Sequence, residues 1–292
     1  VFCSYSHMDT IDTFAPDIDG KTLVFATPGY PVKQIRLPIL MNQVFPALGI
    51  NAIWIPIEVE PDNLSSIFTA FKHFKNFKGM TIAIPYKNPL VHLVDEATER
   101  AKRSGSVNLI RFDENGRSYG DTVDGLGFVV GLEAKGVICQ GKSVYLVGTG
   151  GAGCALAVAL CDAGISTLYL NDIFPEKAEA LAERLRSYYP EIKVRAQHTP
   201  PSDIDLAINA SNSGLQPNDP LPFEPESFGK HTVIADIIMK PKETALLQKA
   251  ASMGYQIHHG HHTLDYQVSL YLDYFGIEHD PSVVLELVQQ IP

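Results

Sequence analysis

Three glycines with a characteristic spacing are the first residues in the sequence that suggest chemistry. Gly148, Gly150 and Gly153 form a Gly-x-Gly-x-x-Gly segment after an apolar run at 144–147 and before an apolar helical pattern at 155–163. In this setting the first glycine allows a tight turn, the second lets backbone amides approach a pyrophosphate, and the third lets the helix pack closely on the strand. The segment therefore predicts a dinucleotide site whose phosphates lie at a helix N-terminus.

A second strand pattern supports the same prediction. Residues 167–170 are apolar and end in Asn171 and Asp172, about twenty positions after the glycines, where a carboxylate accepts a hydrogen bond from a ribose hydroxyl. A glycine-rich turn without a ligand, or the cofactor site of a methyltransferase, would also fit the loop taken alone. We expect cofactor contacts from Gly148, Gly150, Gly151, Ala152, Gly153, Asn171 and Asp172.

Two charged residues follow other strand patterns. Lys87 closes the segment 84–87, and Asp124 lies in the glycine-rich segment 120–127. A cofactor that accepts a hydride needs a partner that removes the hydroxyl proton, and a partly buried lysine oriented by a carboxylate is suited to this. Taken singly, each of the two residues is better explained as a surface charge.

The elements that must position these residues alternate between strand and helix, which is typical of an α/β fold. Asp62 is expected to cap its helix, and residues 114–116 to form a hairpin turn. The expected strands are 21–26, 52–57, 80–84, 107–112, 117–120, 144–147, 167–170, 193–196, 206–209 and 232–238. The expected helices are 38–48, 62–74, 91–103, 124–134, 155–163, 175–188, 244–253, 264–275 and 281–289.

Composition limits the class of protein. The chain has 292 residues, of which 45% are hydrophobic, enough for one large or two ordinary domains. Its net charge of −10 argues against binding to nucleic acid or to an anionic membrane. Four cysteines without metal or disulfide spacing, no secretory signal and no membrane-length apolar run predict a cytoplasmic protein. Residues 1–19 are expected to form a loose leader or a remnant of cloning.

Taken together, several segments resemble the shikimate dehydrogenase family. The family pattern Gly-x-Asn-Val-Thr-x-Pro-x-Lys corresponds to residues 79–87, Gly-Ala-Val-Asn-Thr to 105–109, and Gly-x-Asn-Thr-Asp-x-x-Gly to 120–127. The glycine loop matches as well, and the order of motifs is preserved over nearly the whole chain. Further similar segments are 209–215, 236–241 and 260–267.

This resemblance implies an activity and a site. Lys87 and Asp124 would be the catalytic acid–base pair, and Asn108 and Gln267 would hold hydroxyls of the substrate ring. The reaction would be reversible hydride transfer between a nicotinamide and a ring hydroxyl of shikimate, quinate or a related cyclic alcohol. The cofactor contacts would also include Asn209, Ser211, Ile237 and Gly260.

The resemblance also implies two α/β domains with the active site in the cleft between them. We expect residues 20–124 together with 261–292 to form the substrate-binding catalytic domain. Residues 125–260 would form a Rossmann domain, with a doubly wound parallel sheet that binds NAD(P). The protein would be a monomer or a homodimer, with no nucleic-acid or membrane partner.

The end of the site that binds the substrate carboxylate departs from the family. The family uses two serines there, and this sequence has Ile35 and Leu37 in their places. The threonine before the catalytic lysine is Ala83, and the tyrosine of a later motif is Met239. Because an unpaired buried carboxylate costs several kcal/mol, we expect shikimate and quinate in the usual pose to bind poorly.

Two explanations for this departure stay open. Lys33, Arg36 or Lys240 could hold the acid through a charge-assisted contact, although Arg36 could equally be a solvated cation at a helix start. The substrate could instead be a cyclic alcohol with an apolar tail or none. We expect additional substrate contacts from Gln34, Arg36, Thr263 and Tyr266.

The choice of cofactor has its own signal. Members of the family that use NADP typically have Asn-Arg-Thr after the second strand of the dinucleotide half, whereas this sequence has Asn171, Asp172 and Ile173. A carboxylate accepts from a ribose 2′-hydroxyl and repels a 2′-phosphate, so we predict NAD, with NADP as a possible second cofactor. Alternatively, Asp172 only stabilises the turn and Asn171 contacts the ribose.

Two further interpretations concern metal and turnover. His258, His259, His261 and His262 lie close together in the sequence, but adjacent histidines on an extended strand point to opposite faces, and no carboxylate or cysteine pattern accompanies them. We therefore predict no metal. A nicotinamide-binding regulator or sensor without turnover remains the alternative to an enzyme, and the presence of both a lysine and a carboxylate at the expected positions argues against it.

Overall fold

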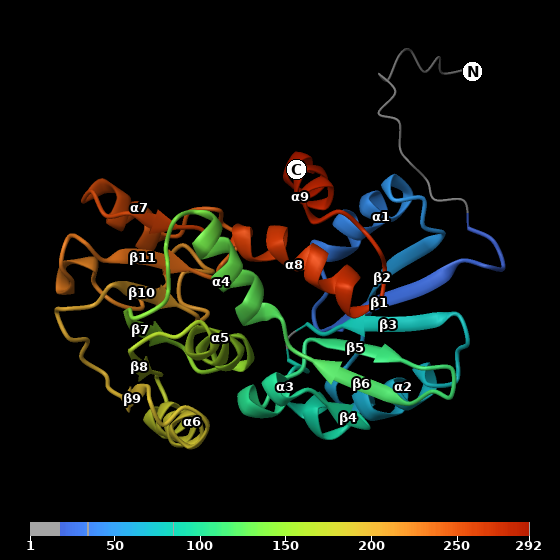
Figure 1. The fold of residues 1–292 in the computed structure, drawn as a ribbon, viewed down its shortest axis with the longest axis horizontal. Coiled ribbons are helices and arrows are strands. Elements are labelled where there is room, and N and C mark those ends of the chain that lie inside the picture. Colours follow the sequence, from blue (N-terminus) through green and yellow to red (C-terminus); the bar gives the residue numbers. More distant parts are fainter. Residues whose placement is uncertain (1–17, 34, 84, 292) are drawn as a thin grey trace, which may run out of the picture.

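The computed structural model describes residues 18–33, 35–83 and 85–291. The expected leader lies outside these residues up to position 17, and so does Gln34, one of the predicted substrate contacts. The described chain forms two six-stranded sheets, which lie side by side with helices α4 and α8 between them (Figure 1). The predicted two-domain α/β class is confirmed.

The first sheet has the strand order β2-β1-β3-β5-β6-β4. Its first three strands are parallel, and β5 and β6 form the antiparallel hairpin that the sequence predicts. The strands are β1 (Leu23–Gly29), β2 (Ala52–Glu58), β3 (Phe77–Thr81), β4 (Glu96–Ala97), β5 (Leu109–Phe112) and β6 (Ser118–Asp121). The helices in this part are α1 (Leu37–Ala47), α2 (Leu64–Phe71) and α3 (Glu99–Ser104).

The second sheet is wholly parallel, with the order β12-β11-β10-β7-β8-β9. The order reverses next to β7, so the carboxyl end of β7 lies at the point where such sheets bind dinucleotides. The strands are β7 (Ser143–Val147), β8 (Thr167–Asn171), β9 (Lys193–Ala196), β10 (Leu206–Asn209), β11 (Val233–Asp236) and β12 (Ile257–His258). Its helices are α4 (Asp124–Ala134), α5 (Gly151–Asp162), α6 (Pro175–Tyr188) and α7 (Ala245–Ser252).

The last two helices return to the first sheet. Helices α8 (His261–Tyr274) and α9 (Pro281–Gln290) bury Val268, Leu272 and Val284 in one apolar cluster with Phe25 and Trp54 of the first sheet. Removing such side chains from water is the main force that holds the C-terminal helices there. The exact division of the chain at 124/125 and 260/261 stays a prediction.

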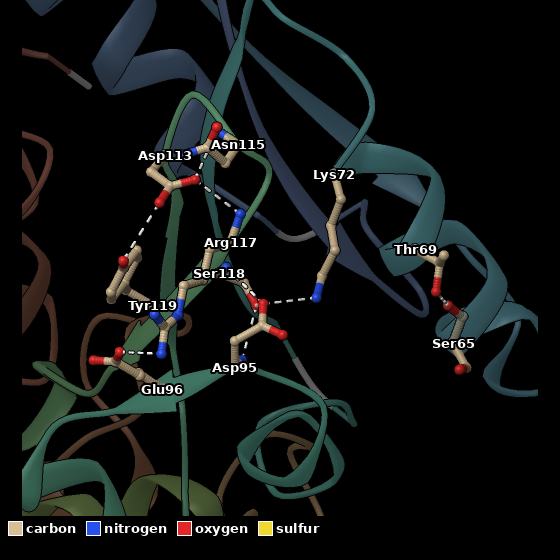
Figure 2. A network of polar contacts seen from close by, with 10 residues as sticks. All are labelled: Ser65, Thr69, Lys72, Asp95, Glu96, Asp113, Asn115, Arg117, Ser118 and Tyr119. Carbon is tan, nitrogen blue, oxygen red and sulfur yellow. Dashed lines mark hydrogen bonds and ion pairs between the residues drawn. The ribbon is translucent and has the colours of Figure 1, made fainter.

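The predicted helix at 91–103 was wrong. The chain there forms a 3₁₀ turn at Pro89–His92, then β4, and only then α3, which Thr98 caps. The carboxylate of Asp95 accepts from the backbone nitrogen of Ser118 at 2.7 Å and from Lys72 Nζ at 2.8 Å (Figure 2). These contacts with residues distant in sequence hold β4 beside β6, and helical periodicity gives no sign of them.

Smaller corrections concern element ends. Asp62 lies inside a 3₁₀ turn at Pro61–Asn63, and no side chain caps α2, so the predicted cap was wrong. The two-residue strand β12 was missed because so short a segment has no periodicity. Among the helices of the described residues, none combines the length and the apolar character needed to cross a membrane.

Candidate active site

Four of the predicted site residues meet at the start of helix α4. Asp124 is the first residue of this helix, and its Oδ2 accepts a hydrogen bond from Nζ of Lys87, which follows β3. The other carboxylate oxygen, Oδ1, accepts from Asn108 Nδ2 at 2.6 Å and from Gln267 Nε2 at 3.0 Å. Three donors therefore fix one carboxylate, while its side chain and that of Lys87 remain 15% and 17% exposed.

Neighbouring residues hold the two amides in place. Asn108 precedes β5, and its Oδ1 accepts from the backbone nitrogen of Val123 at 2.9 Å. Gln267 reaches Asp124 because α4 has a glycine opposite it: a Cβ at Gly127 would lie 2.4 Å from Cγ of Gln267. The close packing of α4 on α8 therefore carries Gln267 to the lysine–carboxylate pair.

Tyr271 completes this cluster and was missed from the sequence. Its hydroxyl donates to Gln267 Oε1 at 2.8 Å. Complete burial, followed by the charge of Asp124, raises the pKa of Tyr271 well above its ordinary value, so the hydroxyl keeps its proton and orients the Gln267 amide. The spacing of four residues on one helix was the available signal, because residues so spaced face the same side.

The glycine loop has the geometry that the motif predicts. Gly148 has a positive φ of +101°, and a Cβ at Gly153 would lie 2.0 Å from the carbonyl oxygen of Gly148. In contrast, a Cβ at Gly150 would meet nothing within 4 Å. The first and third glycines thus serve the turn and the close packing of the helix, and the second leaves open space for a ligand.

The loop also lies beside the lysine. A Cβ at Gly151, the first residue of α5, would lie 3.2 Å from Cβ of Lys87. The N-terminus of a helix attracts anionic groups through its free backbone N–H groups and its dipole. The predicted phosphate-binding end of α5 and the lysine–carboxylate pair are therefore immediate neighbours.

A cavity of about 480 Å³ opens at the carboxyl ends of β7, β8 and β10. Five predicted cofactor residues line it: Gly148, Gly150, Asn171, Asp172 and Ser211. Phe174, Lys177, His198 and Asn212 line it too. The first three lie on loops and a helix face outside the motifs, and Asn212 lies within the similar segment 209–215 but was not expected to contact the cofactor. The open space above Gly150 and this lining fit a dinucleotide.

Asp172 makes the contacts that are expected if its carboxylate stabilises the turn after β8. Its Oδ2 accepts from the backbone nitrogen and the hydroxyl of Thr149 at 2.7 and 2.8 Å, and its Oδ1 accepts from the Phe174 nitrogen at 3.0 Å. Burial alone would raise the pKa of Asp172, but the hydrogen bonds from Phe174 and Thr149 outweigh it and lower the pKa. Asp172 is therefore an ionised group at the rim of the cavity.

The remaining predicted cofactor residues shape the loops around the sheet edge. Asn209 is fully buried and accepts from the Ser211 nitrogen at 3.0 Å, while its Nδ2 donates to Asp236 at 3.2 Å. A Cβ at Gly260 would lie 2.4 Å from the carbonyl carbon of Ile237, so the start of α8 packs on the chain after β11. Ala152 lies in the first turn of α5.

The region that corresponds to the family's carboxylate end is apolar. A Cβ at Gly29 would lie 2.9 Å from Cβ of Ala83 and 3.3 Å from Cδ1 of Ile35. Leu37 is 5% exposed, and Met239 packs against the same apolar cluster as Leu37. The side chains at these positions therefore offer methyl groups and a thioether in place of hydroxyl donors.

Three predicted substrate residues are not brought into the Asp124 cluster. Arg36 Nη2 donates to the carbonyl oxygen of Ile291 at 3.4 Å, at the end of α9. Tyr266 lines a separate cavity of about 330 Å³ with residues of α4, α8 and α9. Thr263 is 6% exposed, and its hydroxyl has no hydrogen-bond partner among the described residues.

The structure corrects both reasons given against a metal. His261 and His262 form the first turn of α8 rather than an extended strand, and a carboxylate, Asp265, lies beside them. Burial lowers the pKa of His258 to about 3 and that of His261 to about 4, so both imidazoles are neutral at pH 7. The prediction that the protein binds no metal therefore loses both of its supporting arguments.

A doubly wound sheet with an open glycine loop beside a lysine–carboxylate pair defines the class of NAD(P)-dependent oxidoreductases. Residues 28–110 match the model of the shikimate dehydrogenase substrate binding domain. The NADP(+) shikimate dehydrogenase of Rubrobacter xylanophilus is 33% identical over 82% of this chain and 85% of its own length. The chain therefore belongs to the shikimate dehydrogenase family.

Solved structures agree with this assignment. Shikimate dehydrogenase from Aquifex aeolicus has a TM-score of 0.83 at 31% identity, covering 93% of this chain and 99% of that one. The 5-ketofructose reductase of Gluconobacter sp. strain CHM43 has a TM-score of 0.81 at 26% identity, with the same coverage. Quinate dehydrogenase from Corynebacterium glutamicum, in complex with NAD, has a TM-score of 0.82 at 26% identity and covers 92% and 99% of the two chains.

Proposed function

We propose that the protein catalyses reversible hydride transfer between a ring hydroxyl of shikimate, quinate or a related cyclic alcohol and a nicotinamide cofactor, with Lys87 and Asp124 as the acid–base pair. The observation that carries this proposal is the contact of Lys87 with Asp124 in a cluster with Asn108 and Gln267. The cluster lies directly beside the N-terminus of α5, where the cofactor phosphates are expected.

Each residue of the cluster has a distinct task in the proposed mechanism. A bound nicotinamide supplies the hydride acceptor or donor. Lys87 Nζ takes the proton of the substrate hydroxyl during oxidation and returns it to the carbonyl oxygen during reduction. Asp124 orients Nζ and offsets its positive charge. Nδ2 of Asn108 uses one hydrogen for Asp124 and has a second for a neighbouring substrate oxygen. Nε2 of Gln267 donates to Asp124 and, at 3.5 Å, to the carbonyl oxygen of Val123, and a substrate oxygen would replace this longer contact.

We further propose that the non-reacting end of the preferred substrate is uncharged. Ile35, Leu37, Ala83 and Met239 supply no hydrogen-bond donor from their side chains, and a carboxylate buried among them would lose its hydration without compensation. The similarity to 5-ketofructose reductase supports this proposal, because the name of that relative specifies a keto sugar rather than an acid.

An acidic substrate held by other cations is the second candidate. Arg36 is the best placed by sequence, but its guanidinium donates to Ile291 at the end of α9, and an acid would have to draw it from that contact. This observation favours the uncharged substrate. A comparison of native and Arg36→Ala protein distinguishes the candidates, since only an acid clamp gives a many-fold rise in KM for shikimate or quinate.

For the cofactor we propose a preference for NAD. The ionised Asp172 at the cavity rim accepts hydrogen bonds and repels a 2′-phosphate. Lys177 is the residue that opposes this preference, because it lines the same cavity and carries the charge that a 2′-phosphate would need. We place the reaction in the cytoplasm, and the free, buried state of Cys139, Cys154 and Cys161 supports a reducing compartment.

The decisive experiment measures nicotinamide reduction with shikimate, quinate and a panel of neutral cyclic polyols, each with NAD and NADP. Native protein is compared with Lys87→Ala and with Lys102→Ala, a lysine on an exposed helix face whose partner is Glu99. We expect turnover that the first variant loses and the second keeps. Nicotinamide binding without turnover of any tested alcohol would instead support the regulator or sensor.

A further inference from the structure

Three side chains at the start of α8 converge outside the Asp124 cluster. His261, His262 and Asp265 each present a potential ligand atom, and these atoms lie within 4.8 Å of one another. Nδ1 of His262 is 3.5 Å from Oδ2 of Asp265. The two histidines occupy the first turn of the helix, and Asp265 follows one turn later, so the spacing directs the three side chains to one side.

Two imidazole nitrogens of this group are buried and make no hydrogen bond. Nδ1 of His261 and Nδ1 of His262 are inaccessible to solvent and have no hydrogen-bond partner within the described part of the chain. Buried nitrogens are nearly always paired, and an unpaired one costs stability. The proposed reaction uses none of these atoms, so their arrangement has no explanation in the dehydrogenase mechanism.

From this geometry we propose that His261, His262 and Asp265 bind a divalent transition-metal ion of the zinc type. Imidazole nitrogens and a carboxylate oxygen are the ligands that such ions take in proteins, and three protein ligands leave a position for water. The N-terminus of a helix carries the positive end of the helix dipole, which disfavours a cation. The carboxylate of Asp265 supplies the negative charge that offsets this effect. Its side chain is only 10% exposed, which strengthens its attraction for a cation.

Such an ion would bind to the helix that also carries Gln267, one of the predicted substrate contacts. The first turn of α8 has no side-chain cap, and its preceding residue, Gly260, packs on the chain after β11. Gln267 lies on the same helix, two residues after Asp265. Metal binding therefore stabilises the start of α8 and makes the position of Gln267 depend on metal occupancy.

The test is zinc binding to the full chain after removal of metals, measured by competition with a chromophoric chelator. We expect one site that weakens at least tenfold in His261→Gln and in Asp265→Asn. The exposed residue His92 provides the matched control, because His92→Gln should leave this site unchanged. Zinc bound elsewhere on the chain titrates equally in all variants.

A second readout guards against loss of structure in the variants. Cobalt bound by two imidazoles and a carboxylate gives visible absorption, which should be present in native protein and in His92→Gln and absent from His261→Gln. Thermal unfolding of the metal-free proteins shows whether the variants fold, and zinc should raise the Tm of the native protein only through this site. Equal zinc affinity in His261→Gln and His92→Gln, or no zinc binding by folded native protein, would overturn the proposal.

Discussion

Gln267 Nε2 donates to Asp124 Oδ1 at 3.0 Å, although 143 residues separate the two in sequence. This contact joins helix α8, which precedes α9, to the first residue of α4. Because Asn108 donates to the same oxygen and Lys87 to the other, four separate segments meet on one carboxylate. The site therefore exists only when the C-terminal part of the chain has returned to the first sheet.

The contact predicts the effect of Gln267→Leu. The variant removes a donor to Asp124 and the proposed substrate contact but keeps the volume of the side chain. Loss of one hydrogen-bonding partner at a buried polar group costs about 1–3 kcal/mol, so we expect kcat/KM to fall roughly 10- to 100-fold. Steady-state kinetics test this, with Gln289→Leu on the exposed face of α9 as the control. An unchanged kcat/KM would exclude a role for Gln267.

The glycine loop predicts that two similar substitutions have different effects. Gly150→Ala places a methyl group where no protein atom lies within 4 Å, so we expect a change in unfolding free energy below about 1 kcal/mol but at least tenfold weaker nicotinamide binding. Gly153→Ala forces a Cβ to 2.0 Å from the Gly148 oxygen and should destabilise the protein by about 1–3 kcal/mol. Calorimetric titration and thermal unfolding separate the two. Unchanged nicotinamide affinity in Gly150→Ala would contradict the assigned site.

The apolar substrate end predicts a gain of function. Replacing Ile35 and Leu37 together by serine restores hydroxyl donors, and we expect kcat/KM for shikimate or quinate to rise at least tenfold. The loss of buried Leu37 should cost about 2–5 kcal/mol of stability. The double alanine variant has a similar loss of packing without hydroxyls and serves as the control. Equal kinetics in the serine and alanine variants would show that these positions do not contact the acid.

The rim of the proposed cofactor cavity predicts how the specificity for NAD or NADP can be changed. Asp172→Asn removes the charge that repels a 2′-phosphate, so the ratio of kcat/KM for NADP to that for NAD should rise about tenfold or more. Lys177→Ala should change the ratio in the opposite direction. Asp203, whose side chain is 98% exposed, is the control position. If Asp172→Asn leaves the ratio unchanged, its carboxylate acts only in the turn.

A buried carboxyl group predicts a pH dependence of stability. Burial raises the pKa of Asp236 to about 6, despite hydrogen bonds from Ile238, Thr244 and Asn209. Between the unfolded value of 3.8 and about 6, the folded state holds more protons than the unfolded state, so this residue makes the protein less stable as pH rises. At about 1.4 kcal/mol for each pH unit, the loss approaches about 3 kcal/mol.

The comparison of native protein with Asp236→Asn measures this effect. Urea unfolding at pH 4.5 and pH 7 should show that the variant lacks the decrease in stability that Asp236 contributes over this range. Other carboxylates, such as Asp95, have lowered pKa values, and they make the protein more stable as pH rises. The difference between the two proteins is therefore the relevant quantity, and parallel stability curves would contradict the raised pKa of Asp236.

Much of the fold could be predicted from local patterns. Helices 124–134 and 175–188 and strands 193–196 and 206–209 have the bounds that the sequence predicts, because each combines a clear periodicity with strong start or stop signals. The edge strand β4 could not be predicted. Its place depends on Asp95, whose partners Ser118 and Lys72 are distant in sequence.

The candidate site could likewise be predicted where the signal is local, and not where it depends on contacts between residues distant in sequence. The glycine loop could be predicted from spacing alone, since each glycine answers a local steric demand. Asn108 and Gln267 came from the resemblance to a family, and only the packing of α4 on α8 shows why they meet. The directions of the histidine side chains were misinterpreted because they depend on whether the chain is helical or extended at this point. The predicted start of α8 was three residues late, so His261 and His262 were not expected to be helical.

Helix α8 starts against the second sheet at Gly260 and ends in the apolar cluster of the first. Between the two sheets the described chain crosses only twice, once where β6 leads into α4 and once where β12 leads into α8. Asp124 and Gln267 belong to the helices that start at these two crossings, so their contact ties the two connections together. Lys87 follows a strand of the first sheet and the glycine loop follows β7 of the second. The lysine and the loop are therefore carried by different sheets, and they meet only in the relative orientation of the two sheets seen here.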